Sequence, residues 1–233
     1  MRRLAAAIVC DMRLQVRNGF YYAAAFVAVF WALALSRIPA KFLALWLPVF
    51  ILSNILINTF YFMAGLVLLE KAEGTLMAQS VTPLRSWEYL ISKVVTLTVV
   101  SVCESLVITL FGYGAAFGPA AFFLGVMSSA VLFALTGFLL VIRYDSINEF
   151  LFPSFLFTLL FVPPFLSYFG FIGSWLVYLH PMQASLLLTQ AAFESIAWWQ
   201  WFYSVLYPIL WIGMLLVFSQ RAFERFVIAA EGK

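Results

Sequence analysis

Residues 70–93 read EKAEGTLMAQSVTPLRSWEYLISK and form the one long polar stretch in a chain that is otherwise almost continuously apolar. The stretch carries charges of both signs. It lies between two apolar runs, residues 42–69 and 90–117, that are each long enough to cross a bilayer. A polar segment that joins two membrane-spanning helices must lie in water. These residues therefore predict a membrane protein with a folded, water-facing segment between two of its spans.

The composition of the whole chain supports the same class. Of its 233 residues, 65% are hydrophobic and 10% are charged, whereas soluble domains are roughly 45–50% apolar and about 25% charged. Together with a mean hydropathy of +1.04, these values exclude a soluble domain and predict an all-α integral membrane protein. The net charge of +3 is explained by membrane topology. No nucleic-acid partner is expected, and the main surroundings should be lipid.

Six apolar runs are candidates for membrane-spanning helices. They are residues 20–36, 42–69, 90–117, 119–142, 150–172 and 201–218. The fifth run contains three prolines, so its helix must kink or break. An even number of spans places both termini on the same side of the membrane.

Lys and Arg residues are divided unevenly between the two sets of loops. One side would hold only Arg37 and Lys41. The other side would hold 11 basic residues: Arg2, Arg3, Arg13, Arg17, Lys71, Arg85, Lys93, Arg143, Arg221, Arg225 and Lys233. Because basic loops stay in the cytoplasm, we expect a multi-pass protein of the cell membrane with both termini and the polar stretch cytoplasmic.

The residues before the first span have the pattern of an amphipathic helix. Leu4, Ile8, Met12 and Val16 recur every four residues, and the arginines fall on the opposite face. This pattern predicts an interfacial helix over residues 1–19 that lies on the inner leaflet. The alternative is a frayed basic tail that only enforces orientation.

The polar stretch itself contains a helix start signal. Thr82 has the residue type of an N-cap, and Pro83 suits the first position of a helix, where its missing N–H has no consequence. We expect a helix that begins at Pro83 and runs into the third span. Residues 70–74 would extend the second span, Gly74-Thr75 would allow a turn, and residues 76–81 would form a short transverse helix.

At this point the sequence resembles a known family. The strings Glu70-Lys71-x-x-Gly74-Thr75-Leu76, Thr82-Pro83-Leu84-Arg85 and Glu88-Tyr89-Leu90-x-x-Lys93 are similar to the segment between the second and third spans of ABC-2 type permeases. The small permeases described as fluoroquinolone exporters have a similar Thr-Pro-Leu-Arg-x-x-Glu-Tyr-Leu string. A second similarity to them is Tyr178-Leu179-His180-Pro181-x-Gln183. The resemblance covers essentially the whole chain.

The resemblance implies a division of the chain along ABC-2 lines. It implies an amino-terminal interfacial helix, six spans, a cytoplasmic coupling helix between spans 2 and 3, and a reentrant outer segment before span 6. The chain would form a single transmembrane domain, 1–233, with these parts: 1–19 interfacial, 20–69 spans 1–2, 70–89 coupling segment, 90–172 spans 3–5, 173–200 outer reentrant segment, 201–219 span 6 and 220–233 cytoplasmic tail.

By resemblance, residues 74–85 would form the helix that docks into an ABC ATPase subunit, although an ordinary amphipathic inner loop is the alternative. The candidate coupling residues are Glu70, Glu73, Gly74, Thr75, Leu76, Thr82, Pro83, Leu84, Arg85 and Glu88. The chain has no Gly-x-x-x-x-Gly-Lys-Ser/Thr loop, so ATP and Mg would be bound by that separate ATPase and no cofactor is expected in this chain. A second permease, identical or homologous, is also implied.

Several polar residues fall inside the expected spans. Glu104 is the only acid deep in a span, with Ser101 and Ser105 beside it, and Asn54 and Asn58 share one face of the second span. One interpretation is that these residues would line a substrate route, in which Glu104 attracts a cationic group or stays protonated. The alternative is that they are hydrogen-bonding contacts between helices.

Catalytic patterns are missing from the sequence. It has no His-Glu-x-x-His, no paired intramembrane carboxylates and no Ser, His and Asp set, and its only histidine has no metal-ligand spacing. We therefore expect no catalytic residues and no metal site. The expected function is a permease subunit that exports a hydrophobic or amphipathic substrate, such as a fluoroquinolone. The alternatives are a secondary transporter or channel without an ATPase, a membrane enzyme, or the same family carrying a lipid, polysaccharide precursor, peptide or ion.

Overall fold

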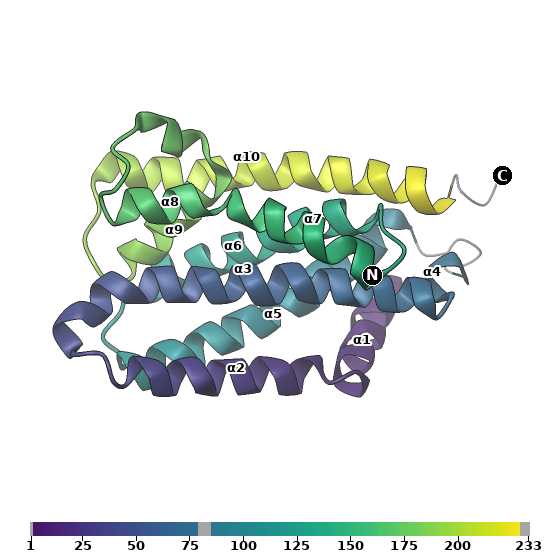
Figure 1. Ribbon diagram of the computed structural model, residues 1–233, viewed down its shortest axis with the longest axis horizontal. Coiled ribbons are helices and arrows are strands. Elements are labelled where there is room, and N and C mark those ends of the chain that lie inside the picture. The colour runs from purple at the N-terminus through teal and green to yellow at the C-terminus, as the bar shows by residue number, and fades with distance from the viewer. Residues whose placement is uncertain (1, 79–84, 229–233) are drawn as a thin grey trace.

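A computed structural model describes residues 2–78 and 85–228, and in these ranges every regular element is a helix (Figure 1). The predicted all-helical membrane fold is thereby confirmed. In chain order the elements are α1 Arg2–Arg17, α2 Phe20–Leu35, α3 Ala40–Ala72, α4 Thr75–Ala78, α5 Ser86–Gly112, α6 Pro119–Val141, α7 Ile147–Leu159, α8 Val162–Tyr168, η2 Trp175–Leu179, α9 Pro181–Ala191, α10 Trp198–Phe223 and η3 Glu224–Ile228.

Five stretches of helix are long and apolar enough to cross a membrane by themselves: α3, α5, α6, α10 and the pair α7–α8. The first predicted span differs. Helix α2 has 16 residues, which is about 24 Å and shorter than the roughly 30 Å of a hydrocarbon core. It qualifies only together with α1, from which it is bent by 67°. The described residues therefore contain five candidate spans, or six if the bent pair α1–α2 counts as one.

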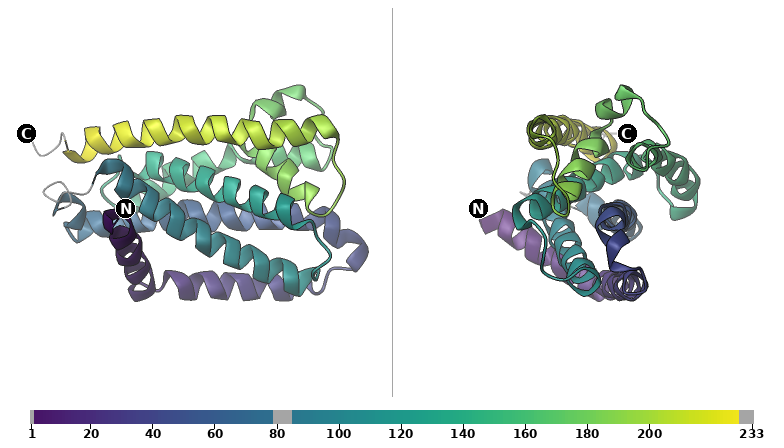
Figure 2. Two further views of the ribbon diagram at one scale, coloured as in Figure 1. Left: turned by 180° about the vertical axis from the view of Figure 1, so that it is seen from behind. Right: turned by 90° about the vertical axis from the view of Figure 1, so that its left-hand side faces the viewer.

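Helix α1 lies across one end of the bundle, beside α5. Helix α4 and the C-terminal end of α10 lie at the same end (Figures 1 and 2). The turn into α2 is made at Gly19, whose φ of 80° is in the region that favours glycine. The predicted apolar stripe does not pack into the bundle: Met12 and Val16 are about half exposed. Asp11 and Gln15 on another face of α1 are buried instead.

Helix α6 is the centre of the bundle and packs against α3, α5, α9 and α10. Two glycines allow its neighbours to come close. A Cβ atom added at Gly137 would lie 2.7 Å from the carbonyl oxygen of Phe60 in α3, and one at Gly125 would lie 2.8 Å from the backbone nitrogen of Thr189 in α9. Because α9 also contacts α10, the segment before the last span is held inside the bundle; its reentrant character stays a prediction.

The fifth predicted span is broken between α7 and α8, as its prolines predict. Pro163 and Pro164 open α8, and Pro164 cannot donate a hydrogen bond to the carbonyl of Leu160. The imidazole of His180 bonds to the Leu160 backbone instead, and its Nδ1 accepts the Met182 N–H at 3.2 Å at the start of α9. Burial lowers the pKa of His180 below its ordinary value, which keeps the ring neutral for these two contacts.

The start of the third span differs from the prediction. Arg85 is extended, with φ −82° and ψ 149°, and α5 begins at Ser86. A continuous helix from Pro83 into this span is therefore wrong. The helix start uses another signal, because the Glu88 carboxylate accepts the Arg85 N–H at 2.9 Å. Thr82, Pro83 and Leu84 lie outside the described residues, as does half of the predicted transverse helix, residues 79–81. The described half lies in α4, after a turn at Gly74 with φ 71°.

Candidate functional site

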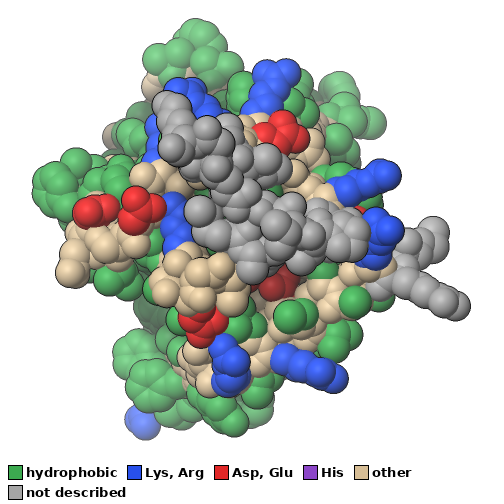
Figure 3. Space-filling view, turned by 90° about the vertical axis from the view of Figure 1, so that its right-hand side faces the viewer, with side chains coloured by type: hydrophobic (Ala, Val, Ile, Leu, Met, Phe, Trp, Pro, Cys, Tyr) green, Lys and Arg blue, Asp and Glu red, His purple; other side chains and the backbone are tan. Residues whose placement is uncertain are grey.

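Charged side chains gather at the end of the bundle that carries α1 and α4. Figure 3 shows this face, with Lys, Arg, Asp and Glu side chains spread around its described surface. In its described part this face has two ion pairs, Arg17 with Glu73 and Lys71 with Asp145, each with a nitrogen–oxygen distance of 3.1 Å. The two acids are partly or largely exposed. We refer to this face as the charged end.

Lys71 has a second role at the charged end. Its ammonium donates to the carbonyls of Ile142 and Tyr144, 2.8 Å each, just past the last residue of α6. Carbonyls at a helix C-terminus lack intrahelical partners and carry partial negative charge. The lysine therefore joins the end of α3 to the end of the central helix.

Beneath this surface lies a buried ion cluster formed by Asp11, Glu70, Tyr89, Ser92 and Lys93. The Lys93 side chain is fully buried, and its ammonium is 2.9 Å from Asp11 and within ion-pair distance of Glu70. The Tyr89 hydroxyl donates to the second oxygen of Glu70 at 2.7 Å, and Ser92 donates to Asp11. The cluster therefore joins three helices: Asp11 comes from α1, Glu70 from α3, and the other three from α5.

The sequence gives only weak signals for this cluster. The count of basic residues places Lys93 with the inner loops, and no motif in the sequence marks Asp11. Gln15 lies one turn after Asp11, is also buried, and donates to Thr96 at 2.8 Å. The two residues make one short polar edge along α1, which is the signal that could have located the contact with α5.

The predicted coupling residues fall into two groups by exposure. Glu73, Gly74, Thr75 and Arg85 are exposed at the charged end. Glu70, Leu76 and Glu88 are buried: Glu70 belongs to the ion cluster, Leu76 is part of the core, and Glu88 caps α5. Thr82, Pro83 and Leu84 are outside the described residues. The role of all of these residues in coupling stays a prediction.

A second buried polar site lies farther along the bundle and brings together three residues that the sequence singled out. The Glu104 carboxylate of α5 accepts hydrogen bonds from the amides of Asn54 and Asn58 in α3. Asn58 donates to both of its oxygens and Asn54 to one, at 3.1 Å each. Glu104 is 4% exposed. We call these three residues the carboxylate–amide cluster.

The serine hydroxyls near Glu104 differ in their hydrogen-bond partners. Ser101 and Thr59 are 2.6 Å apart across α5 and α3. Ser105 is fully buried, and its hydroxyl has no partner among the described residues. A role of Ser101 and Ser105 in a substrate route stays a prediction.

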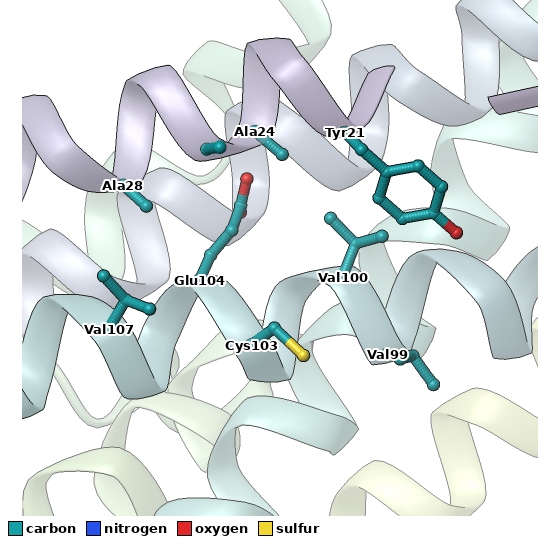
Figure 4. A pocket seen from close by; sticks show the side chains of 9 residues that line it. Tyr21, Ala24, Ala28, Val99, Val100, Cys103, Glu104 and Val107 are labelled. Atoms are coloured by element: carbon teal, nitrogen blue, oxygen red, sulfur yellow. The ribbon is translucent and has the colours of Figure 1, made fainter. Parts of the chain in front are cut away.

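A cavity of about 220 Å³ lies between α2 and α5, with Glu104 in its wall (Figure 4). Apart from Tyr21, the other lining residues are small or apolar and include Ala24 and Ala28 of α2 and Val100 and Val107 of α5. The cavity is therefore an apolar space with a single carboxylate. Within the described ranges, no three His, Cys, Asp or Glu side chains are grouped so as to hold a metal ion.

Comparison with known proteins gives matches along the whole chain. The sequence model of the fluoroquinolones export permease protein family matches residues 2–231. Two similar relatives, from the CDC 1551 / Oshkosh and H37Rv strains of Mycobacterium tuberculosis, each carry the name fluoroquinolones export permease protein. Each is 32% identical to this chain over 235 residues, which cover 100% of the chain and 99% of the relative.

Proposed function

This chain belongs to the fluoroquinolones export permease protein family, and we propose that it is the membrane subunit of an ATP-driven exporter of amphipathic drugs. The observation that carries the proposal is the family match over residues 2–231. The names of the two mycobacterial relatives make a fluoroquinolone the first substrate to test. The chain would act as a transport subunit and not as an enzyme.

The energy source would be a separate ABC ATPase that binds ATP and Mg. The chain has no phosphate-binding loop of its own, so hydrolysis needs a partner. A second permease, identical or homologous, would complete the transport pathway. A secondary transporter or channel without an ATPase is the competing function, and it predicts export that does not depend on the partner.

The ATPase would dock at the charged end, which the charge distribution of the sequence assigns to the cytoplasm together with both termini. Glu73, Thr75 and Arg85 are exposed there and are the residues we expect to touch the partner. Glu70 and Glu88 would act indirectly, since both are buried. This division separates residues that bind the ATPase from residues that hold the coupling segment in place.

The ion cluster gives a route by which docking can act on several helices. Gly74 and α4 follow directly on α3, so a force that the ATPase exerts on the turn at Gly74 would move the end of α3. Glu70 in that helix is tied through Lys93 to α5, and Lys93 is tied through Asp11 to α1. Three helices would therefore move together when the ATPase changes its conformation.

The proposed transport is tested by drug accumulation. Cells that express this chain with the ATPase encoded beside it should accumulate less of a fluorescent fluoroquinolone than cells with an ATPase variant that lacks its phosphate-binding lysine. Equal accumulation in both would remove the drug assignment. Export that persists with the inactive ATPase would instead favour a secondary transporter.

The proposed docking is tested by copurification in mild detergent. Arg85→Glu should reduce the amount of ATPase recovered with the tagged chain, because it reverses an exposed charge at the charged end. Arg37→Glu is the matched control, since Arg37 is exposed beyond the far end of α2. Equal losses in the two variants would contradict a docking site at the charged end.

A further inference from the structure

We propose that the cavity beside Glu104 is a binding site for the ammonium group of an amphipathic cation that enters from the bilayer. The inference deepens the proposed function and rests on it, because it names the class of substrate that this permease would take. It is carried by a buried carboxylate in the wall of an apolar cavity, with no ion-pair partner among the described residues.

The first argument is the surroundings of the carboxylate. Both oxygens of Glu104 accept amide hydrogen bonds, from Asn54 and Asn58. An ionised carboxylate only accepts hydrogen bonds, so two amide donors suit that form. Among the residues described by the structure, no Lys, Arg or His forms an ion pair with it. Acids inside a membrane usually have a partner of opposite charge, and here that partner would be the ligand.

The second argument is the shape of the cavity. It extends along α2 from Tyr21 to Ala28, which is seven residues or about 10 Å of helix. Ala24 and Ala28 leave space opposite Glu104, and valines of α5 form the other wall (Figure 4). A volume of about 220 Å³ is below the roughly 300–1,000 Å³ of pockets that enclose whole drugs. It would hold an ammonium group and an adjoining ring, while the rest of the ligand stays in lipid.

The third argument is access from the membrane. Val99 is 53% exposed and Cys103 is also exposed on α5, and both line the cavity. These residues lie on an apolar surface in the middle of a membrane-spanning helix. A lipid chain would fit the apolar walls without using the carboxylate, and a proton relay would use the carboxylate without needing the apolar space. An amphipathic cation uses both.

The test measures binding of two probes that differ only in charge. The cation is 4-butylbenzyltrimethylammonium, whose charge is fixed at every pH, and the neutral control is 4-butylneopentylbenzene, in which carbon replaces the nitrogen. Both are tritium-labelled, and binding to nanodiscs containing the full chain is corrected for binding to empty nanodiscs. We expect the corrected affinity for the cation to exceed that for the neutral probe by about tenfold or more, because the charge pair is desolvated.

Two variants locate the site. Glu104→Gln keeps the size and hydrogen-bonding capacity of the side chain and removes its charge, so the preference for the cation should disappear. Glu194→Gln, an exposed acid near the opposite end of the bundle, should leave it unchanged. Ala28→Leu fills the cavity and should weaken the binding of both probes. Ala28→Val is the milder replacement if the leucine variant does not give a monodisperse protein.

The proposal is overturned if the parent binds both probes equally, which would indicate a lipid site, or if Glu104→Gln keeps the preference. These outcomes differ from a failure of the proposed function. Drug export without cation binding at Glu104 would leave the permease assignment standing and remove this site. Cation binding that depends on Glu104 without any drug export would leave this site standing and remove the assignment of drug export.

Discussion

The ion cluster and the carboxylate–amide cluster both contain buried acids, yet they balance the negative charge differently. In the ion cluster, Asp11 and Glu70 share the ammonium of Lys93. In the carboxylate–amide cluster, Glu104 has two neutral amides around it. The first site supplies its own cation and joins three helices. The second site has a carboxylate whose charge is solvated by amides, next to an open cavity.

This difference separates structure from function within one bundle. Charges that are fully paired inside the protein make a fixed connection, because breaking it leaves an uncompensated buried charge. A carboxylate held by neutral amides can bind and release a cation without breaking an ion pair of the protein. Four changes test whether the two sites differ in this way, and the free energy of unfolding in detergent, from SDS titration followed by circular dichroism, is the common measurement.

Lys93→Met should have the largest effect. It removes the ammonium that pairs with both Asp11 and Glu70, and removing one partner of a buried ion pair costs about 3–5 kcal/mol. Lys41→Met is the control, because Lys41 is exposed. Adding Asp11→Asn and Glu70→Gln to Lys93→Met should recover part of the loss. A Lys93→Met protein as stable as the Lys41→Met protein would show that the ion cluster does not hold the helices.

Asn58→Leu should have a smaller effect at the second site. It removes the amide that donates to both oxygens of Glu104, and hydrogen bonds to charged groups contribute about 1.5–3 kcal/mol. Asn148→Leu, at an exposed position of α7, is the control. Combining Asn58→Leu with Glu104→Met should restore most of the stability, since the acid no longer needs a partner. No recovery in the double variant would mean that Asn58 acts through packing and not through Glu104.

Tyr89→Phe should be milder again. The change removes one hydrogen bond of 2.7 Å to Glu70 while Lys93 still pairs with that carboxylate. We expect a loss of about 1–2 kcal/mol. Tyr22→Phe is a suitable control because Tyr22 is 74% exposed. A loss as large as that of Lys93→Met would indicate that the tyrosine, and not the lysine, is the centre of the cluster.

The sequence predicted the second cluster better than the first. Asn54 and Asn58 are four residues apart on one helix, and a lone glutamate in an apolar run stands out, so each signal is visible by itself. The ion cluster needs the position of α1, which depends on the bend at Gly19 and on its contact with α5. Periodicity predicted that α1 is amphipathic. It did not identify the residues of α5 against which α1 packs.

The start of α5 shows a second limit of prediction from sequence. Thr82-Pro83 is a good local start signal, but Glu88 is three residues after Arg85 and makes its own capping contact. Two competing signals within one turn leave the boundary undecided until tertiary contacts are known. The first span shows the opposite case, because α2, Phe20–Leu35, follows the apolar run of residues 20–36 to within one residue.

The smallest effect on stability is expected for the Arg17–Glu73 pair at the charged end. Its side chains are 66% and 36% exposed, and exposed ion pairs contribute about 0–1 kcal/mol. A double-mutant cycle with Arg17→Ala and Glu73→Ala measures this coupling. Salt should weaken it further, because exposed charges are screened. Glu73 would then be free to exchange Arg17 for a residue of the ATPase at little expense in stability. A coupling energy as large as the loss expected for Lys93→Met would mean instead that the Arg17–Glu73 pair holds the helices together as the ion cluster does. Docking would then not use this pair.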